Sequence, residues 1–275
     1  MTRQTFFRHV LALPLSGKIG LALVCFWIVA ALVGPLIAPY PPGAFVSEEV
    51  FAGASSRFWL GSDFLGRDVL SRLLVGGRFT VGLSLMAVAI AATIGTGLAL
   101  TAAVGPRWLD ELLSRAMDTL ISIPSKIFAL VLVAAFGSSL VLLTLIVAIT
   151  YVPGNFRIAR SLAVGLAQLD YVEVARARGE GRLHIALVEM LPNMIRTLFA
   201  DIGLRFVFIV LLLSGLSFLG LGLQPPDADL GSLVRENVSG LAEGALAILV
   251  PATAIATLTV GVNLLIDAAT QGGVK

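Results

Sequence analysis

Four long runs without a charged residue constrain the fold of this chain more than any other feature of its sequence. They cover residues 19–38, 79–104, 206–226 and 245–266. Each run holds about 20 residues or more, which is the length that a helix needs to cross a hydrocarbon core ~30 Å thick. The sequence therefore predicts at least four membrane-spanning helices.

A fifth apolar stretch is too long for a single span. Residues 119–156 contain one charged side chain, that of Lys126. At ~1.5 Å per residue, a helix of this length would be nearly twice as long as the core is thick, so the stretch must fold back. The cluster Gly137-Ser138-Ser139 is the natural position of the turn. We therefore expect an all-α polytopic membrane protein with about six transmembrane helices.

The composition supports this fold class. Of the 275 residues, 57% are hydrophobic and 13% are charged, and the mean hydropathy is +0.97. A soluble domain of this length needs far more charge to cover its surface. The single cysteine, Cys25, lies inside the first run, so no disulfide framework is expected. That run is longer than the apolar part of a cleaved signal peptide, and we expect an uncleaved first span.

The distribution of lysine and arginine predicts the orientation of the chain. If the N-terminus is cytoplasmic, the inside segments carry thirteen of these residues and the outside segments carry five. This excess satisfies the rule that cytoplasmic loops are the more basic. We therefore expect both termini in the cytoplasm, residues 39–78 and 227–244 outside, and residues 155–205 inside. The asymmetry also explains the net charge of +2 without a nucleic-acid partner.

The inside segment has a pattern of its own. Its centre is typical of a short helix, a glycine stop, a second short helix and a proline at the start of the next span. We expect Asp170 to cap the first helix and Gly179 to end it in the left-handed conformation. A small apolar face is formed by Val172, Ala175, Ala177 and Leu183. Composition leaves three readings of that face: contact with lipid headgroups, a groove on a cytoplasmic partner, or a solvated loop.

The spacing within this segment resembles the cytoplasmic EAA loop of ABC-type importer permeases. The matching residues are Glu173, Ala175, Gly179, Leu191 and Pro192. The resemblance implies a coupling helix that docks in a cleft of an ATPase subunit, with Arg176 and Arg178 in the same contact. Val174 replaces the usual alanine, and Met190 stands where isoleucine or leucine is common. Both departures keep the face small or apolar.

Three further segments resemble one branch of that family, the dipeptide/oligopeptide/nickel permeases. They are residues 59–72, 217–226 and 263–267, and they occur in the order of that branch. The resemblance implies a type I ABC importer permease fold. Residues 1–78 would form an N-terminal region with the first span and an external segment. Residues 79–270 would form the transmembrane core, with the coupling loop at residues 155–197.

The function implied by the resemblance is that of a permease subunit in an ATP-driven importer. It would form half of a translocation path for peptides, or a related small solute, delivered by an extracytoplasmic binding protein. The implied partners are a homologous B-type permease, two cytoplasmic ATPase subunits and the lipid of a bacterial cytoplasmic membrane. The sequence contains no Walker-type phosphate loop and no catalytic set, so we expect no enzyme activity and no cofactor on this chain. ATP and magnesium would bind to the ATPase partners. His9 and His184 are isolated from each other, and we expect no metal site.

Three charged residues, Lys126, Asp201 and Arg205, lie at or near membrane depth, which raises the hypothesis of a translocation path. A simpler reading is that Asp201 and Arg205 pair across one helical turn while Lys126 extends to the headgroups. The rival function is an ATPase-independent channel or secondary transporter that uses these charges for ion coupling. The identity of the substrate stays open.

Overall fold

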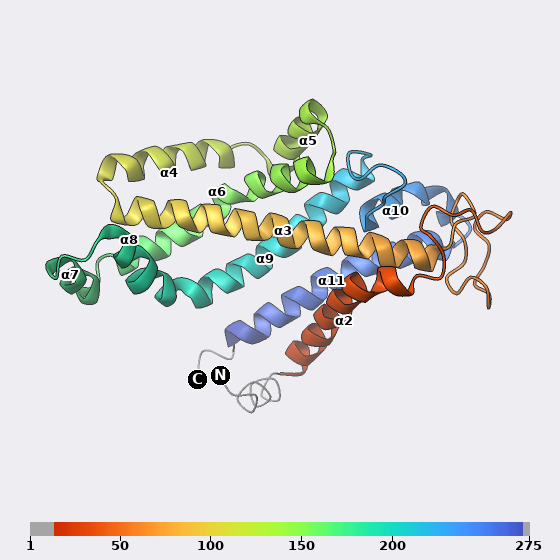
Figure 1. The fold of residues 1–275 in the computed structure, drawn as a ribbon, viewed down its shortest axis with the longest axis horizontal. Helices are drawn as coiled ribbons and strands as arrows, with labels where there is room; N and C mark the ends of the chain where they lie inside the picture. The colour runs from red at the N-terminus through yellow and green to blue at the C-terminus, as the bar shows by residue number, and fades with distance from the viewer. Residues whose placement is uncertain (1–13, 272–275) are drawn as a thin grey trace.

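The computed structural model describes residues 14–271, and its regular structure there is helical (Figure 1). Within this range, five helices are long and apolar enough to cross a membrane. They are α2 (Leu15–Ile37), α3 (Val69–Val104), α6 (Leu140–Leu166), α9 (Leu191–Phe218) and α11 (Leu246–Gln271). The expected all-α polytopic fold is confirmed.

The sixth expected span is broken. Helices α4 (Arg107–Ile121) and α5 (Ser125–Phe136) meet at an angle of 85°. Pro124 lies in the break, where it lacks an N–H and forces the preceding residue out of the helical conformation. At 12 residues, α5 is too short to cross the core alone. The span expected before residue 137 is therefore bent, and the count of about six spans holds if the bent pair crosses as a unit.

The predicted turn after α5 is confirmed. Gly137 ends the helix with φ at 94°, a conformation that side chains rarely adopt. The hydroxyl of Ser139 then accepts a hydrogen bond from the Leu142 N–H and caps α6. The chain therefore turns at residues 137–139, between the end of α5 and the start of α6.

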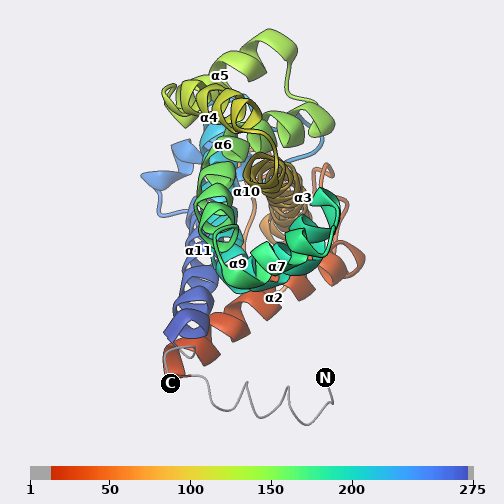
Figure 2. The same cartoon turned by 90° about the vertical axis from the view of Figure 1, so that its left-hand side faces the viewer.

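Helix α3 lies at the centre of the bundle, with α4 and α5 on one side and α2 on the other (Figures 1 and 2). Small residues allow its neighbours to come close. A Cβ on Gly95 would lie 2.5 Å from Oδ1 of Asn155 on α6. Helices α2 and α11 also touch through glycine, since a Cβ on Gly20 would lie 2.6 Å from the Leu265 backbone nitrogen. Such contacts are typical of helices packed in a membrane.

The segment at residues 38–68 is folded against the end of the bundle that carries α10 (Leu230–Glu236). A buried ion cluster holds it there. Asp63 Oδ2 lies 2.7 Å from both Arg67 Nε and Arg72 Nη1, and Glu236 Oε2 lies 2.8 Å from both arginines. Asp68 then caps α3 by accepting from the Ser71 N–H. Helix α3 consequently begins ten residues before the predicted span at residue 79.

Candidate functional site

The segment that matches the coupling loop projects from the opposite end of the bundle (Figure 1). It consists of α7 (Asp170–Ala177), the short α8 (Arg182–His184) and a π-helix, η1 (Ile185–Met190). Helix α6 continues to residue 166, and α9 begins at residue 191. The projection therefore covers residues 167–190, which is shorter than the expected loop at residues 155–197, because the flanking helices extend beyond their charge-free runs.

The start and the end of α7 differ in how well the sequence predicted them. Leu169 occupies the N-cap position, and Asp170 is the first residue of the helix. No side chain makes a capping hydrogen bond at this end, so the predicted cap is wrong. The predicted stop is confirmed: Gly179 has φ at 82°. Its N–H donates to the Arg176 carbonyl at 2.9 Å, and the Glu180 N–H donates to the Ala175 carbonyl at 3.1 Å. These two bonds satisfy carbonyls that the helix end would otherwise leave free.

One face of α7 is buried within the chain itself. Val172 and Ala175 have no exposed surface, and they pack in one cluster with Ile185 and Met190 of η1. The prediction that both residues belong to a free apolar face is therefore wrong. The reason is a contact with η1 that helical periodicity cannot reveal. Leu183, by contrast, is 72% exposed, as a free apolar residue would be.

The opposite face of α7 is exposed. Glu173, Val174 and Arg176 lie on it, and Val174 is 55% accessible to solvent. Arg178 follows at the helix end and lies 3.5 Å from a carboxylate oxygen of Glu189. It pairs there rather than with Glu173, and at 58% exposure the pair contributes little to stability. Within residues 14–271, neither Glu173 nor Arg176 takes part in an ion pair, so both are free to contact a partner.

The second half of the segment, from Arg182 onward, is joined to α9 without a break in the helical path. Residues Arg182–Phe218 form one apolar helical unit of 37 residues. Pro192 lies in the first turn of α9, directly after Leu191. In a regular helix the proline ring would clash with the carbonyl four residues earlier, and the wider π-turns of η1 remove that clash. The helical path that begins at Arg182 therefore continues without a break to Phe218.

A series of hydrogen-bonded polar side chains crosses the interior of the bundle. The predicted pair is confirmed: Arg205 Nε and Nη2 lie 2.6 and 2.9 Å from the two carboxylate oxygens of Asp201. Asn155 of α6 donates to the Asp201 carboxylate at 3.0 Å, and its own oxygen accepts from Thr96 of α3 at 3.1 Å. This series of hydrogen bonds thus links α3, α6 and α9. The sequence contained a signal for Asn155, the one amide side chain of residues 119–156.

Lys126 takes no part in that series of hydrogen bonds. It is exposed in the first turn of α5, and it belongs to none of the ion pairs formed within residues 14–271. A cavity of about 260 Å³ lies beside the bend between α4 and α5, and both Arg157 and Arg205 line it. The structure therefore pairs Asp201 with Arg205, whereas Lys126 pairs with neither and is not among the residues that line the cavity.

A bundle of five or six membrane-spanning helices with a short projecting helix at one end is the architecture of a multi-pass membrane protein. The family of binding-protein-dependent transport system inner membrane components matches residues 93–271. The chain belongs to this family.

Curated relatives agree with the assignment. The chain is 32% identical to the glutathione transport system permease of Pectobacterium atrosepticum, over 96% of this chain and 88% of the relative. It is 31% identical to a di/tripeptide transport system permease of Pseudomonas aeruginosa, over 92% and 84% of the two chains. A dipeptide transport system permease of Alkalihalophilus pseudofirmus is 29% identical, over 90% and 82%. The chain is therefore a permease component of an ATP-driven importer, and these matches do not support the channel or secondary-transporter alternative.

Proposed function

We propose that this chain is the C-type permease subunit of a peptide importer and that α7 couples it to an ATPase. The observation that carries the proposal is the combination of one buried and one exposed face on α7 with an unbroken helical arm behind it. The buried face fixes α7 to the arm, and the exposed face is left for a partner.

Each site residue has a separate role in this proposal. Glu173 and Arg176 contact the ATPase cleft, while Ala175 holds α7 on η1. Gly179 ends α7, and Arg178 lies beside Glu189 at that end. Leu191 and Pro192, the last two residues that match the loop pattern, join the segment to α9. Closure of two ATPases around ATP would then move α9. This movement would switch the path from opening to one side of the membrane to opening to the other, because the two states differ in their contacts.

The remaining partners follow from the same assignment. A homologous B-type permease supplies the other half of the path, and an extracytoplasmic binding protein delivers the ligand. ATP and magnesium bind to the two cytoplasmic ATPase subunits, and this chain itself is non-catalytic and binds no cofactor. Both termini lie in the cytoplasm of a bacterium, with residues 38–68 on the outer face of the inner membrane.

Peptides are the substrate that the relatives favour, since their names specify dipeptides, tripeptides and glutathione. We place Arg205 on the path, because it lines the cavity of about 260 Å³ while Asp201 compensates its charge. Lys126 would lie at the edge of that path, near the headgroups.

The test is a charge reversal on the exposed face of α7. E173K should leave membrane insertion and assembly intact, because Glu173 is exposed and makes no ion pair within the described part of the chain. It should abolish the stimulation of ATP hydrolysis by ligand-loaded binding protein in the reconstituted importer. E243K is the matched control, since it reverses an exposed glutamate that makes no ion pair within the described residues and lies outside the segment that contains α7. Normal stimulation with E173K would refute the coupling role.

A further inference from the structure

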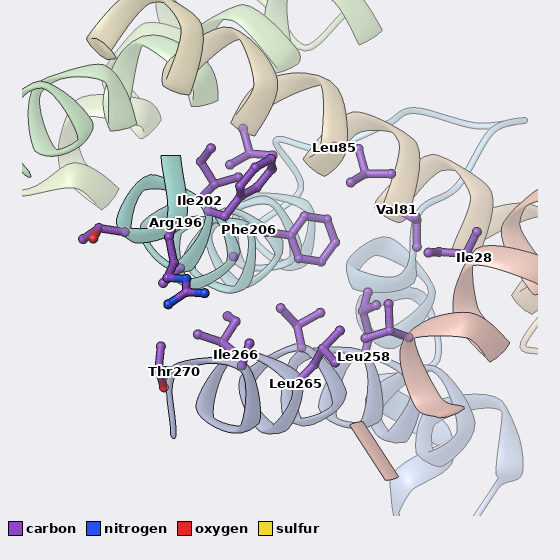
Figure 3. Close-up of a pocket in the computed structure, with 18 residues that line it drawn as sticks. Ile28, Val81, Leu85, Arg196, Ile202, Phe206, Leu258, Leu265, Ile266 and Thr270 are labelled. Carbon is purple, nitrogen blue, oxygen red and sulfur yellow. The ribbon is translucent and has the colours of Figure 1, made fainter. Parts of the chain in front are cut away.

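A pocket of about 840 Å³ lies between α2, α3, α9 and α11 (Figure 3). It is on a different side of α9 from the hydrogen-bonded pair Asp201 and Arg205. Its walls are almost entirely aliphatic or aromatic, with Ile28, Val81 and Phe206 among them. Polar side chains gather at one end, where Figure 3 shows Arg196 and Thr270. The pocket is therefore amphipathic along its length.

The two ends of the pocket lie at different depths. Arg196 and Phe206 are ten residues apart on α9, which corresponds to ~15 Å along the helix axis. That distance equals half of a hydrocarbon core ~30 Å thick. Counted ~20 residues back from the far end of α9 at Phe218, the boundary of the core falls close to Arg196. The pocket thus extends from headgroup level, on the side of α7, to the middle of the membrane.

The charge at the mouth has no internal partner. Arg196 is exposed, and it takes part in no ion pair or side-chain hydrogen bond within residues 14–271. Figure 3 shows its guanidinium extending from α9 toward the side of α11 that carries Thr270. A guanidinium is suited to a phosphate group, to which it donates two parallel hydrogen bonds. Basic pockets between transmembrane helices bind anionic headgroups in this way.

We propose that the pocket binds an anionic phospholipid from the leaflet on the side of α7. One acyl chain fills the apolar part, and Arg196 holds the phosphate. The lipid would touch α3 and α9 on one side and α2 and α11 on the other.

The test measures lipid retained by the membrane complex that copurifies with the full-length chain. Native mass spectrometry would count phosphatidylglycerol and phosphatidylcholine bound after extraction from mixed bilayers. R196A should lower the affinity for phosphatidylglycerol about fivefold, which is the worth of one arginine near a charged surface. R196K should retain most of the binding. R115A is the matched control, because Arg115 is an exposed arginine on α4 that does not line the pocket.

Two further variants separate the acyl site from the charge. A200F should fill the pocket and lower retention of both lipids while Arg196 stays in place. A photo-crosslinking residue at position 85, which is half exposed and lines the pocket, should label lipid. Equal retention of phosphatidylglycerol by R196A and the native chain would overturn the proposal. Crosslinking at position 85 to a protein chain instead of lipid would also overturn it.

Discussion

The left-handed glycine at the end of α7 allows a test in which steric crowding has no part. Gly179 has φ at 82°, and a Cβ added there would meet no atom within 4 Å. The cost of G179A is therefore the backbone penalty alone, about 1–2 kcal/mol. Gly181 supplies the matched control, because a Cβ there is equally unobstructed and its φ of −71° suits any residue.

The penalty should appear as local opening of the helix end. The Glu180 N–H donates to the Ala175 carbonyl only while residue 179 keeps its left-handed conformation. A cost of 1–2 kcal/mol corresponds to about a 5–30-fold larger open population. Hydrogen exchange of the Glu180 amide should accelerate by that factor in G179A and stay unchanged in G181A. G179N should fall between them, because asparagine tolerates this conformation.

A functional assay on the same variants would connect the helix end to transport. Loosening of α7 should lower ligand-stimulated ATP hydrolysis in G179A while the basal rate of the ATPases is kept. Equal exchange rates in G179A and G181A would refute the claim that the left-handed residue fixes the end of α7. Accelerated exchange with normal stimulation would instead show that this end is dispensable for coupling.

Three other predictions concern the stability of the fold, and each is read from the unfolding of purified protein in detergent. D63N leaves two buried guanidinium groups with one carboxylate and should cost about 3–5 kcal/mol, whereas E111Q removes an exposed partner and should cost under ~1 kcal/mol; equal costs would contradict the burial argument. G95A places a Cβ against Asn155 and should cost about 1–3 kcal/mol, whereas G97A meets nothing within 4 Å and should not lower stability by that amount. Burial raises the pKa of the Asp229 carboxyl, so its contribution to stability is complete below the unfolded pKa of ~3.9 and is lost as pH rises through the higher folded value. D229N should lack this decline, and an unchanged pH profile would show that another group causes it.

The sequence predicted the features that depend on local chemistry. Charge-free length located the spans, and the need for φ above zero located the stops at Gly137 and Gly179. The pairing of Asp201 with Arg205 followed from their spacing of one helical turn. The family resemblance located the coupling segment, which the residues alone left among three readings.

Features that depend on distant parts of the chain were not predictable. Val172 looked free because its partners in η1 lie on the far side of a turn. The ion cluster joins Asp63 to Glu236 across most of the chain through two arginines, and no local spacing links them. The 85° bend before α5 was hidden because Pro124 lies within an apolar stretch that has the hydropathy of a span.

The contact between α2 and α11 affects the order in which the bundle assembles during synthesis. The indole N–H of Trp27 donates to the Thr257 hydroxyl at 3.1 Å, and Gly20 lies against Leu265. Helix α2 leaves the ribosome long before α11, so the side of α2 that packs on α11 stays uncovered until α11 has been made. Contacts between such distant segments form late, because a long loop must close first. Until α11 inserts, that side of α2 therefore faces lipid.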